Sequence, residues 1–386
     1  MEKTPQAQDV TLPPEVHALR QAAPRPLGLY MMLLKGAEAA ALALAPDDKA
    51  RLATSTEATQ DIARFLEGVQ RYRSYPFSRA ATPYTLLAHY GRCALHHCGG
   101  SGKPVFLVPS MVNKAYVLDL LPEASLVRSL IAAGHSVYML DWNTPDGRDV
   151  LSFDTAVTDI LVPAVGAACA HAKHADCVVL GYCMGGLLAL ALATHAPKRV
   201  RALVAAATPW DFSGSVFGAL VKMGYPFYDL MLQAAPLVPV DMLQSAFMLL
   251  DPLGPVGRLQ AFAAERDAGQ LRRMAAMEDW LADGIPLESP IARTCLFDWY
   301  KDNKPLHGTW QVAGKTVDAT AIDVPVLVAV PQRDIVVPAQ SARALAGVLP
   351  QATVLDVPTG HIGMMVGRKA QTGFFDPLSN WLARLP

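Results

Sequence analysis

Short apolar runs alternate with longer segments of helical period through most of the chain. Continuous apolar runs of this length are typical of parallel strands that are buried on both faces. The apolar runs are Pro104 to Pro109, Ser136 to Leu140, Cys177 to Leu180, Ala202 to Ala207, Pro325 to Val330 and Thr353 to Val357. The helical segments are Leu118 to Ala133, Phe153 to His174, Met184 to His195 and Ala339 to Leu349. The alternation predicts an α/β fold with a mostly parallel central sheet and helices on both of its faces.

Two regions depart from this alternation. From about residue 211 to 317 the sequence becomes helical and rich in aromatic residues, which predicts a helical lid inserted between two strands. Residues 1–75 form another helical region, with amphipathic segments from Pro26 to Ala45 and from Glu57 to Tyr72. We therefore expect an N-terminal helical region, 1–75, followed by one catalytic domain, 76–386, that carries the lid.

A cysteine lies where an apolar strand meets an alanine- and leucine-rich helix. Residues 181–186 read Gly-Tyr-Cys-Met-Gly-Gly, and Cys183 is the third of them. In a nucleophile elbow the strained turn presents the nucleophile above the sheet, and the flanking glycines let neighbouring backbone approach closely. A helix N-terminus and a nearby base both favour the thiolate, which is the attacking species. The segment predicts acyl transfer by Cys183; the alternative is a buried cysteine in a glycine-rich turn.

A base and a carboxylate follow in the order that α/β-hydrolases use. Asp334 comes after the strand Pro325 to Val330, and His361 follows the next strand in a Gly-His-Ile-Gly loop. Catalytic groups of open sheets collect at the carboxyl ends of the strands. We therefore expect a Cys183, Asp334, His361 triad on an α/β-hydrolase fold whose lid follows the sixth strand. Asp356 and Asp323 are the alternatives for the carboxylate.

The oxyanion hole and the remaining histidines are assigned by position. Backbone N–H groups stabilise the oxyanion in acyl transfer, and they leave no residue-type signature. We expect the N–H of Met184 and one from the loop after Pro109, with Val112 preferred to Met111. His135 and His195 are interpreted as ordinary residues at the ends of elements.

Composition and charge exclude several other classes of protein. The formal net charge is −1 and no block of lysine and arginine occurs, so nucleic acid is not an expected partner. The six cysteines lack the spacing of a disulfide framework and are expected to be reduced thiols. Cys93, His96, His97 and Cys98 lack a second ligand pair, so no metal site is expected.

The chain also lacks the usual signals for secretion or membrane insertion. Met1 to Glu15 contains no apolar signal core, and no uncharged apolar run reaches about 18 residues. We expect a cytoplasmic protein without a transmembrane span. The stretch from Val216 to Val256 is strongly apolar. Its favoured interpretation is a buried cap core, and the alternatives are a partner surface or contact with an apolar product.

Several motifs, in order, resemble the class III and IV poly(3-hydroxyalkanoate) synthase catalytic subunits from about Lys103 to the end. Any one of these motifs is weak, but their order and spacing are specific. They are the Gly-x-Cys-x-Gly-Gly box at 181–186, Val112 to Leu120, Asp141 to Pro145, Thr208 to Phe212, Met277 to Trp280, Phe297 to Lys304 and the Gly-His-Ile-Gly loop at 360–363.

The resemblance implies that (R)-3-hydroxyacyl-CoA is polymerised into polyester with release of CoA. Cys183 would carry the growing chain as a thioester, His361 would deprotonate Cys183, and Asp334 would help to activate the 3-hydroxyl of the incoming unit. The resemblance also implies a second synthase subunit, a homo-oligomer and a place at the surface of polyester granules. It implies no cofactor, because the CoA thioester is itself the substrate.

The sequence departs from the family at three points. Met184 replaces the common Gln, Asn143 replaces the Gly of an Asp-Trp-Gly motif, and Phe153-Asp154-Thr155 replaces an acidic pair. The first 75 residues match the family poorly. Two alternatives remain: an intracellular polyester depolymerase or thioesterase with the same triad, and a non-catalytic granule-associated paralogue.

Overall fold

The computed structural model describes residues 12–24 and 27–385. The chain divides into two compact units. The first unit comprises Met1–Ala80 and Asp241–Asp283, and the second comprises Ala81–Val240 and Gly284–Pro386. Most of Met1 to Glu15, where the sequence shows no apolar signal core, lies outside the described residues.

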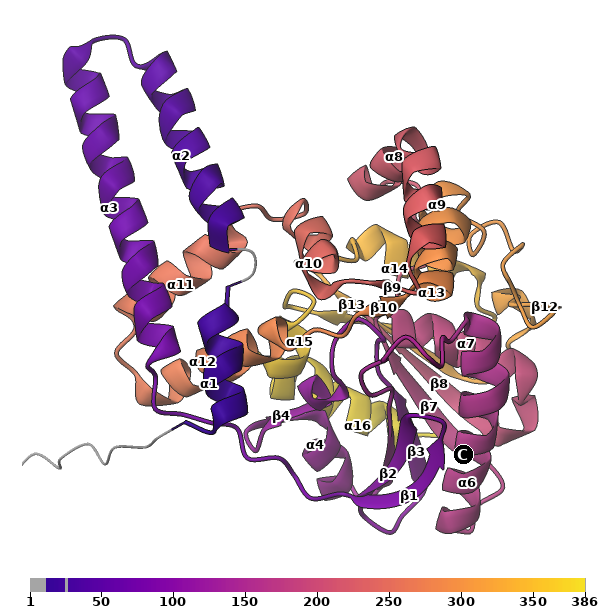
Figure 1. The fold of residues 1–386 in the computed structure, drawn as a ribbon. Helices are drawn as coiled ribbons and strands as arrows, with labels where there is room; N and C mark the ends of the chain where they lie inside the picture. Colours follow the sequence, from indigo (N-terminus) through magenta and orange to yellow (C-terminus); the bar gives the residue numbers. More distant parts are fainter. Residues whose placement is uncertain (1–11, 25–26, 386) are drawn as a thin grey trace, which may run out of the picture. The chain divides into compact units, whose positions relative to one another are not determined.

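The second unit is built on an eight-stranded sheet (Figure 1). Its order is β1-β2-β6-β3-β7-β8-β13-β14, and only the pairs β1–β2 and β2–β6 are antiparallel. Six of the strands precede the inserted segment, as the sequence predicts. The strands are β1 (Thr85–Tyr90), β2 (Cys93–Gly99), β3 (Pro104–Val108), β6 (Ser136–Asp141), β7 (Cys177–Tyr182), β8 (Val200–Ala206), β13 (Val326–Pro331) and β14 (Ala352–Val357).

Helices cover both faces of this sheet. Figure 1 shows α6 and α7 along one face and α4 and α16 along the other. The mostly parallel α/β fold is confirmed. The central strands β3, β7 and β13 are buried at every position, which explains why their sequences are continuous apolar runs. The helices are α4 (Leu126–Ala132), the continuous helix of α5 (Phe153–Thr155), η2 (Ala156–Leu161) and α6 (Val162–Ala172), α7 (Met184–His195), α14 (Ala339–Val348), α15 (Gly363–Val366) and α16 (Asp376–Leu382).

The structure corrects one predicted helix and adds two strands. The helix expected from Leu118 to Ala133 begins only at Leu126, where Ser125 caps it by accepting from the Arg128 N–H. Before it lie η1 (Ala115–Leu118) and the short pair β4 (Asp119–Leu121) and β5 (Ala124–Ser125). Asp119 is buried and accepts from Thr82 and Tyr84, which holds this segment out of the helix.

The two missed strands are β1 and β2, and β2 contains the two cysteines and two histidines considered as metal ligands. Histidines and partly exposed positions interrupt both strands, so neither strand is a continuous apolar run. Within residues 12–24 and 27–385, no group of three or more Cys, His, Asp or Glu side chains is placed to hold a metal ion. All six cysteines are free.

The inserted segment is shared between the two units. The second unit keeps α8 (Val216–Met223), α9 (Tyr225–Ala234), the paired strands β9 (Leu237–Val238) and β10 (Leu287–Glu288), α13 (Ser289–Arg293) and η4 (Thr294–Lys301), followed by the small hairpin of β11 (Gln311–Val312) and β12 (Lys315–Thr316) and by η5 (Ala319–Ala321). The middle of the insertion, with α10 (Val240–Met248), α11 (Gly254–Ala264) and α12 (Ala268–Ala282), belongs almost entirely to the first unit. The structure thus divides the chain differently from the sequence analysis, which treated 1–75 and the lid 211–317 as separate regions.

A buried ion pair joins the two sequence segments of the first unit. The N-terminal helices are α1 (Pro14–Ala22), α2 (Leu27–Leu44) and α3 (Asp48–Arg73). Arg20 of α1 is fully buried and donates to both carboxylate oxygens of Asp279 on α12, at 2.7 and 2.8 Å. The Tyr72 hydroxyl also donates to Asp279, at 2.9 Å. Residues some 200 positions apart in sequence therefore form one core, which no local pattern could indicate.

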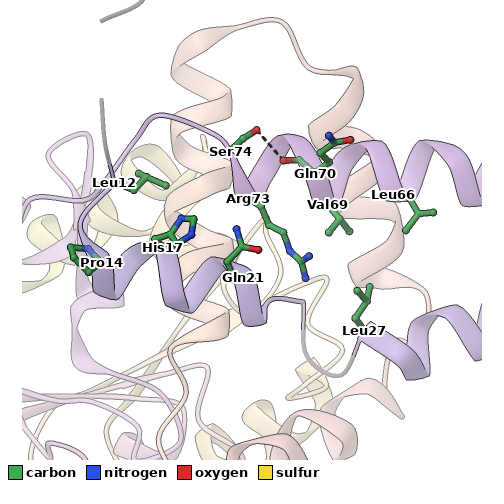
Figure 2. A pocket seen from close by; sticks show the side chains of 10 residues that line it. All are labelled: Leu12, Pro14, His17, Gln21, Leu27, Leu66, Val69, Gln70, Arg73 and Ser74. Carbon is green, nitrogen blue, oxygen red and sulfur yellow. Dashed lines mark hydrogen bonds between the residues drawn. The ribbon is translucent and has the colours of Figure 1, made fainter. Parts of the chain in front are cut away.

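An open pocket of about 850 Å³ lies among α1, α2 and α3 (Figure 2). Leu27, Leu66 and Val69 form its apolar wall, and the Arg73 guanidinium reaches the Ala23 carbonyl beside it at 2.9 Å. None of the predicted site residues lines this pocket.

Two helical stretches in the described part of the chain are long and apolar enough to cross a membrane. Phe153–Ala172 is half buried and packs on the sheet as a core helix, whereas only 6% of the Pro14–Leu44 window is buried. Both stretches contain charged residues, so neither holds an uncharged apolar run of about 18 residues.

The cap-core interpretation of Val216 to Val256 is only partly correct. In the second unit, Val221 and Leu232 are buried, but Met223, Phe227 and Leu230 are exposed by 80, 65 and 68%. One side of α8 and α9 therefore presents large apolar side chains to solvent.

Candidate active site

Cys183 lies at the sharp turn between β7 and α7. Its backbone has φ 57° and ψ −124°, a conformation that side-chain-bearing residues rarely adopt. Hydrogen bonds hold it there, because the Cys183 N–H donates to the Ala206 carbonyl at 2.8 Å and the Cys183 carbonyl accepts from the Gly186 N–H at 2.9 Å. Cys183 is also the N-cap residue of α7, so its side chain lies at the positive end of a helix. The strand-to-helix turn predicted at Cys183 is therefore present.

Two glycines of the elbow are required by close backbone approach. A Cβ on Gly185 would lie 2.0 Å from the Val108 carbonyl oxygen, and one on Gly181 would lie 2.2 Å from the Gly185 carbonyl oxygen. Both obstacles are backbone atoms, which cannot rotate away. The first turn of α7 can therefore approach β3 and β7 only if these positions lack a side chain.

His361 and Asp334 are brought together at the carboxyl ends of β14 and β13. The His361 Nδ1 lies 2.6 Å from one carboxylate oxygen of Asp334. The other oxygen accepts from the Val336 and Val337 N–H groups, both at 2.8 Å. The Asp334 side chain is fully buried and that of His361 is 10% exposed. Asp334 therefore has both oxygens occupied and meets His361 in a site nearly free of water.

The charges of its neighbours strongly raise the pKa of His361. Burial alone lowers this pKa, but the negative charges of Cys183 and Asp334 and hydrogen bonds to both residues outweigh burial and raise it to about 10. The imidazole therefore carries a proton at neutral pH and faces Cys183 as a cation.

The alternative carboxylates and histidines lie elsewhere. Asp356 accepts from Gln332 and Arg343, and Asp323 accepts from Gln351. His135 and His195 each bond a backbone carbonyl, of Lys103 and Val312 respectively. Among the described residues, Asp334 is thus the carboxylate that pairs with His361.

The two N–H groups expected to stabilise the oxyanion differ in whether a hydrogen bond already occupies them. Met184 is the first residue of α7, so its N–H has no carbonyl partner within the helix. The Val112 N–H instead donates to the Ser110 hydroxyl at 3.3 Å. The loop that carries Val112 is fixed from its other side, because the Val112 carbonyl accepts from the Ile285 N–H at 3.0 Å.

Three side chains around Cys183 were not singled out from the sequence. Burial raises the pKa of Cys295 and of Tyr300 on η4, and the charge of Cys183 raises both further. Both residues therefore lie within electrostatic reach of Cys183. Tyr182 contacts His361 directly. The only signal in the sequence was that Tyr182 belongs to the elbow motif and Tyr300 to a recognised lid motif.

The replacement of glycine by Asn143 fits the backbone at that position. Asn143 has φ 53°, in the left-handed region where asparagine is the best tolerated residue after glycine. Its side chain donates to the Arg92 carbonyl at 2.7 Å. The change preserves the turn.

Comparison with known proteins agrees with this geometry. A family model described as the alpha/beta hydrolase fold matches residues 95–368. A poly(3-hydroxyalkanoate) polymerase subunit PhaC of Synechocystis sp. is 30% identical over 292 residues, covering 72% of this chain and 77% of its own. The PhaC subunit of Allochromatium vinosum is 30% identical over 287 residues, covering 72% of this chain and 80% of its own.

The relatives differ in length from this chain. The PhaC subunit of Haloferax mediterranei is 29% identical over 287 residues, or 72% of this chain, but only 58% of its own length is matched. For the PhaC subunit of Haloarcula marismortui the matched share is 60%. The chain thus spans about three fifths of these two relatives.

Proposed function

Because the chain belongs to the poly(3-hydroxyalkanoate) polymerase subunit PhaC family, within the α/β-hydrolase fold, we propose that it polymerises (R)-3-hydroxyacyl-CoA thioesters into polyester and releases CoA. Cys183 is the proposed nucleophile, His361 the proton carrier, and Asp334 the residue that positions His361. The observation that best supports this assignment is the pair formed by the Cys183 thiol and a His361 whose pKa is raised to about 10.

In the first step the Cys183 thiolate attacks the thioester carbonyl of the substrate. A new bond forms between its Sγ and the carbonyl carbon, and the electron pair of the carbonyl moves to oxygen. The Met184 N–H stabilises this oxyanion, and the Val112 N–H joins it by exchanging the Ser110 hydroxyl for the substrate oxygen. The carbon–sulfur bond to CoA then breaks, and the CoA sulfur takes the proton of His361.

In the second step the acyl group passes to an alcohol. Neutral His361 accepts the proton of the 3-hydroxyl of an incoming hydroxyacyl-CoA, whose oxygen attacks the Cys183 thioester. An ester bond forms, and Cys183 leaves as a thiolate beside a protonated His361. The elongated acyl-CoA then acylates Cys183 again and releases its CoA. Each cycle thus restores the initial ion pair.

Asp334 acts through His361 in this scheme. Its side chain is fully buried and both carboxylate oxygens already accept hydrogen bonds. These contacts favour a role in orienting the imidazole and stabilising its charge over direct contact with the 3-hydroxyl, the role that the family resemblance had implied.

Partners and location follow from the same proposal. We expect activity to depend on a second synthase subunit and on self-association, because the relatives are named as subunits. The insoluble product would place the enzyme in the cytoplasm at a polyester surface. The chemistry described uses only side chains and the CoA thioester, so the proposal contains no metal or organic cofactor.

The test compares CoA release from (R)-3-hydroxybutyryl-CoA by wild type and by Cys183→Ala, with insoluble polymer assayed in parallel. Cys98→Ala, which changes another partly buried cysteine outside the site, is the matched control. We expect CoA release with polymer from wild type and control, and none from Cys183→Ala. Release of free hydroxyacid without polymer would indicate a depolymerase or thioesterase instead, and unchanged release by Cys183→Ala would refute the nucleophile.

A further inference from the structure

Tyr182 joins the strand that carries the nucleophile to the loop that carries the base. It is the last residue of β7, directly before Cys183, and only 2% of it is exposed. Its hydroxyl donates to the main-chain carbonyl of His361 at 3.1 Å. Its ring centroid lies 5.2 Å from that of the His361 imidazole, with 33° between the planes.

Each contact restricts a different freedom of His361. The Asp334 carboxylate holds Nδ1 at 2.6 Å and sets the direction of the ring. The hydroxyl of Tyr182 holds the main chain of the loop, and its ring limits movement of the imidazole perpendicular to its plane. Because Tyr182 and Cys183 are consecutive, the restraint on His361 originates one residue from the nucleophile.

The hydroxyl remains a donor throughout the working pH range. Burial raises the pKa of Tyr182 well above its usual value, and the charges of Cys183 and Asp334 raise it further. These two residues are also the charged groups that raise the pKa of His361. The phenol is therefore neutral whenever the ion pair exists.

We propose that Tyr182 is a positioning residue that fixes the distance between His361 and Cys183 and so maintains their ion pair. The inference rests on the proposed function of the triad. It extends that function to a side chain whose hydroxyl bonds the main chain of the His361 loop and whose contribution passes through that loop.

The experiment removes only the hydroxyl, by Tyr182→Phe. The matched control is Tyr138→Phe, which removes a buried tyrosine hydroxyl from β6 of the same sheet, where it bonds Ser136 and His171. Two properties are measured for proteins that circular dichroism shows to be folded. One is the rate of alkylation of Cys183 by iodoacetamide at pH 7, located by peptide mass spectrometry. The other is the pH profile of CoA release, resolved into kcat and KM.

For Tyr182→Phe we expect about fivefold slower alkylation, the effect of losing one ordinary hydrogen bond. We also expect kcat to fall by a similar factor while KM is unchanged. The decline of CoA release at alkaline pH should begin at a lower pH than in wild type, because a loosened His361 releases its proton more easily. Tyr138→Phe is expected to match wild type in each property. A purely structural role would lower the melting temperature without moving this decline.

The result that overturns the inference is a Tyr182→Phe protein whose alkylation rate and alkaline decline equal those of wild type. His361→Gln separates this outcome from failure of the proposed function. If His361→Gln alkylates as fast as wild type, no ion pair activates Cys183 and the triad itself is refuted. If His361→Gln is slow while Tyr182→Phe is unchanged, the triad stands and only the role of Tyr182 is lost.

Discussion

At the scale of single residues, the site depends on a cysteine held in a strained conformation beside a protonated histidine. The positive φ of Cys183 is maintained by its hydrogen bonds to β8 and α7. The raised pKa of His361 follows from two negative neighbours in a buried site. Neither property belongs to the isolated side chain, and each requires the other residues to be in place.

Substitution of the proposed nucleophile, Cys183, by serine tests whether the chemistry needs a thiolate. The hydroxyl of serine ionises far less readily than a thiol, so a protonated His361 cannot stabilise it as an alkoxide. We expect Cys183→Ser to lose CoA release by a factor of about 100 or more, in line with removal of an activated nucleophile. Stopped-flow measurement of CoA thiol gives the rate, and a serine variant within tenfold of wild type would contradict the ion-pair mechanism.

The Asp334 carboxylate has a predicted signature in the pH profile. A raised pKa keeps His361 protonated up to about pH 10, so CoA release should decline as pH rises through that value rather than near 6.5. Asp334→Asn removes one of the charges that raise this pKa and should move the decline to lower pH. The rate should also fall by about 100-fold or more, as in other triads. If CoA release declines at the same pH in Asp334→Asn as in wild type, Asp334 does not act on His361.

At the scale of elements, the elbow requires α7 to begin almost in contact with the backbone of β3. Gly185 makes this approach possible. The same strand-to-helix turn places the N–H of Met184 next to Cys183, so packing and the proposed oxyanion stabilisation depend on the same few residues.

Gly185→Ala should therefore damage both stability and activity. Its Cβ would meet the Val108 carbonyl at 2.0 Å, and the backbone must shift to relieve the clash. We expect a loss of about 2 kcal/mol in the free energy of unfolding and at least a tenfold loss of CoA release. Gly166→Ala on α6 is the control, since nothing lies within 4 Å of its Cβ and helix propensity favours alanine by roughly 1 kcal/mol. Equal effects of the two substitutions in urea denaturation would contradict this account.

At the scale of the whole molecule, the chain forms two compact units that are interleaved in sequence. The first unit is completed only when α10 to α12 have been synthesised, because Arg20 on α1 pairs with Asp279 on α12. The stability of the N-terminal helices therefore depends on a segment 259 residues away in sequence.

Arg20→Met tests this dependence. The substitution leaves the mostly buried Asp279 carboxylate without its cation, which typically costs about 3–5 kcal/mol. We expect the first unit to unfold at lower urea concentration while the second unit keeps its transition, as followed by hydrogen exchange of each unit. The control Arg64→Met changes an exposed arginine paired with Asp61 and should cost less than about 1 kcal/mol. Unchanged protection of α1 and α12 in Arg20→Met would refute the role of the pair.

The sequence by itself determined the parallel sheet, the elbow and the order of the candidate triad. Buried parallel strands must be apolar throughout, and a strand-to-helix turn that presents a nucleophile must contain glycine, so both leave local patterns. The pattern also located α7, from Met184 to His195, without error. The positions of Asp334 and His361 could be predicted because they directly follow recognisable strands.

Only the tertiary structure decided which atoms meet. The pairing of Asp334 with His361, the occupied Val112 N–H and the contact of Tyr182 with His361 join residues distant in sequence, and no local period encodes them. The strands β1 and β2 escaped prediction because their half-exposed residues lack a continuous apolar run. The inserted segment is divided between two units, and its middle part joins the N-terminal helices through long-range contacts such as the Arg20–Asp279 ion pair. Local patterns reflect burial along one element, whereas these features arise from packing between elements.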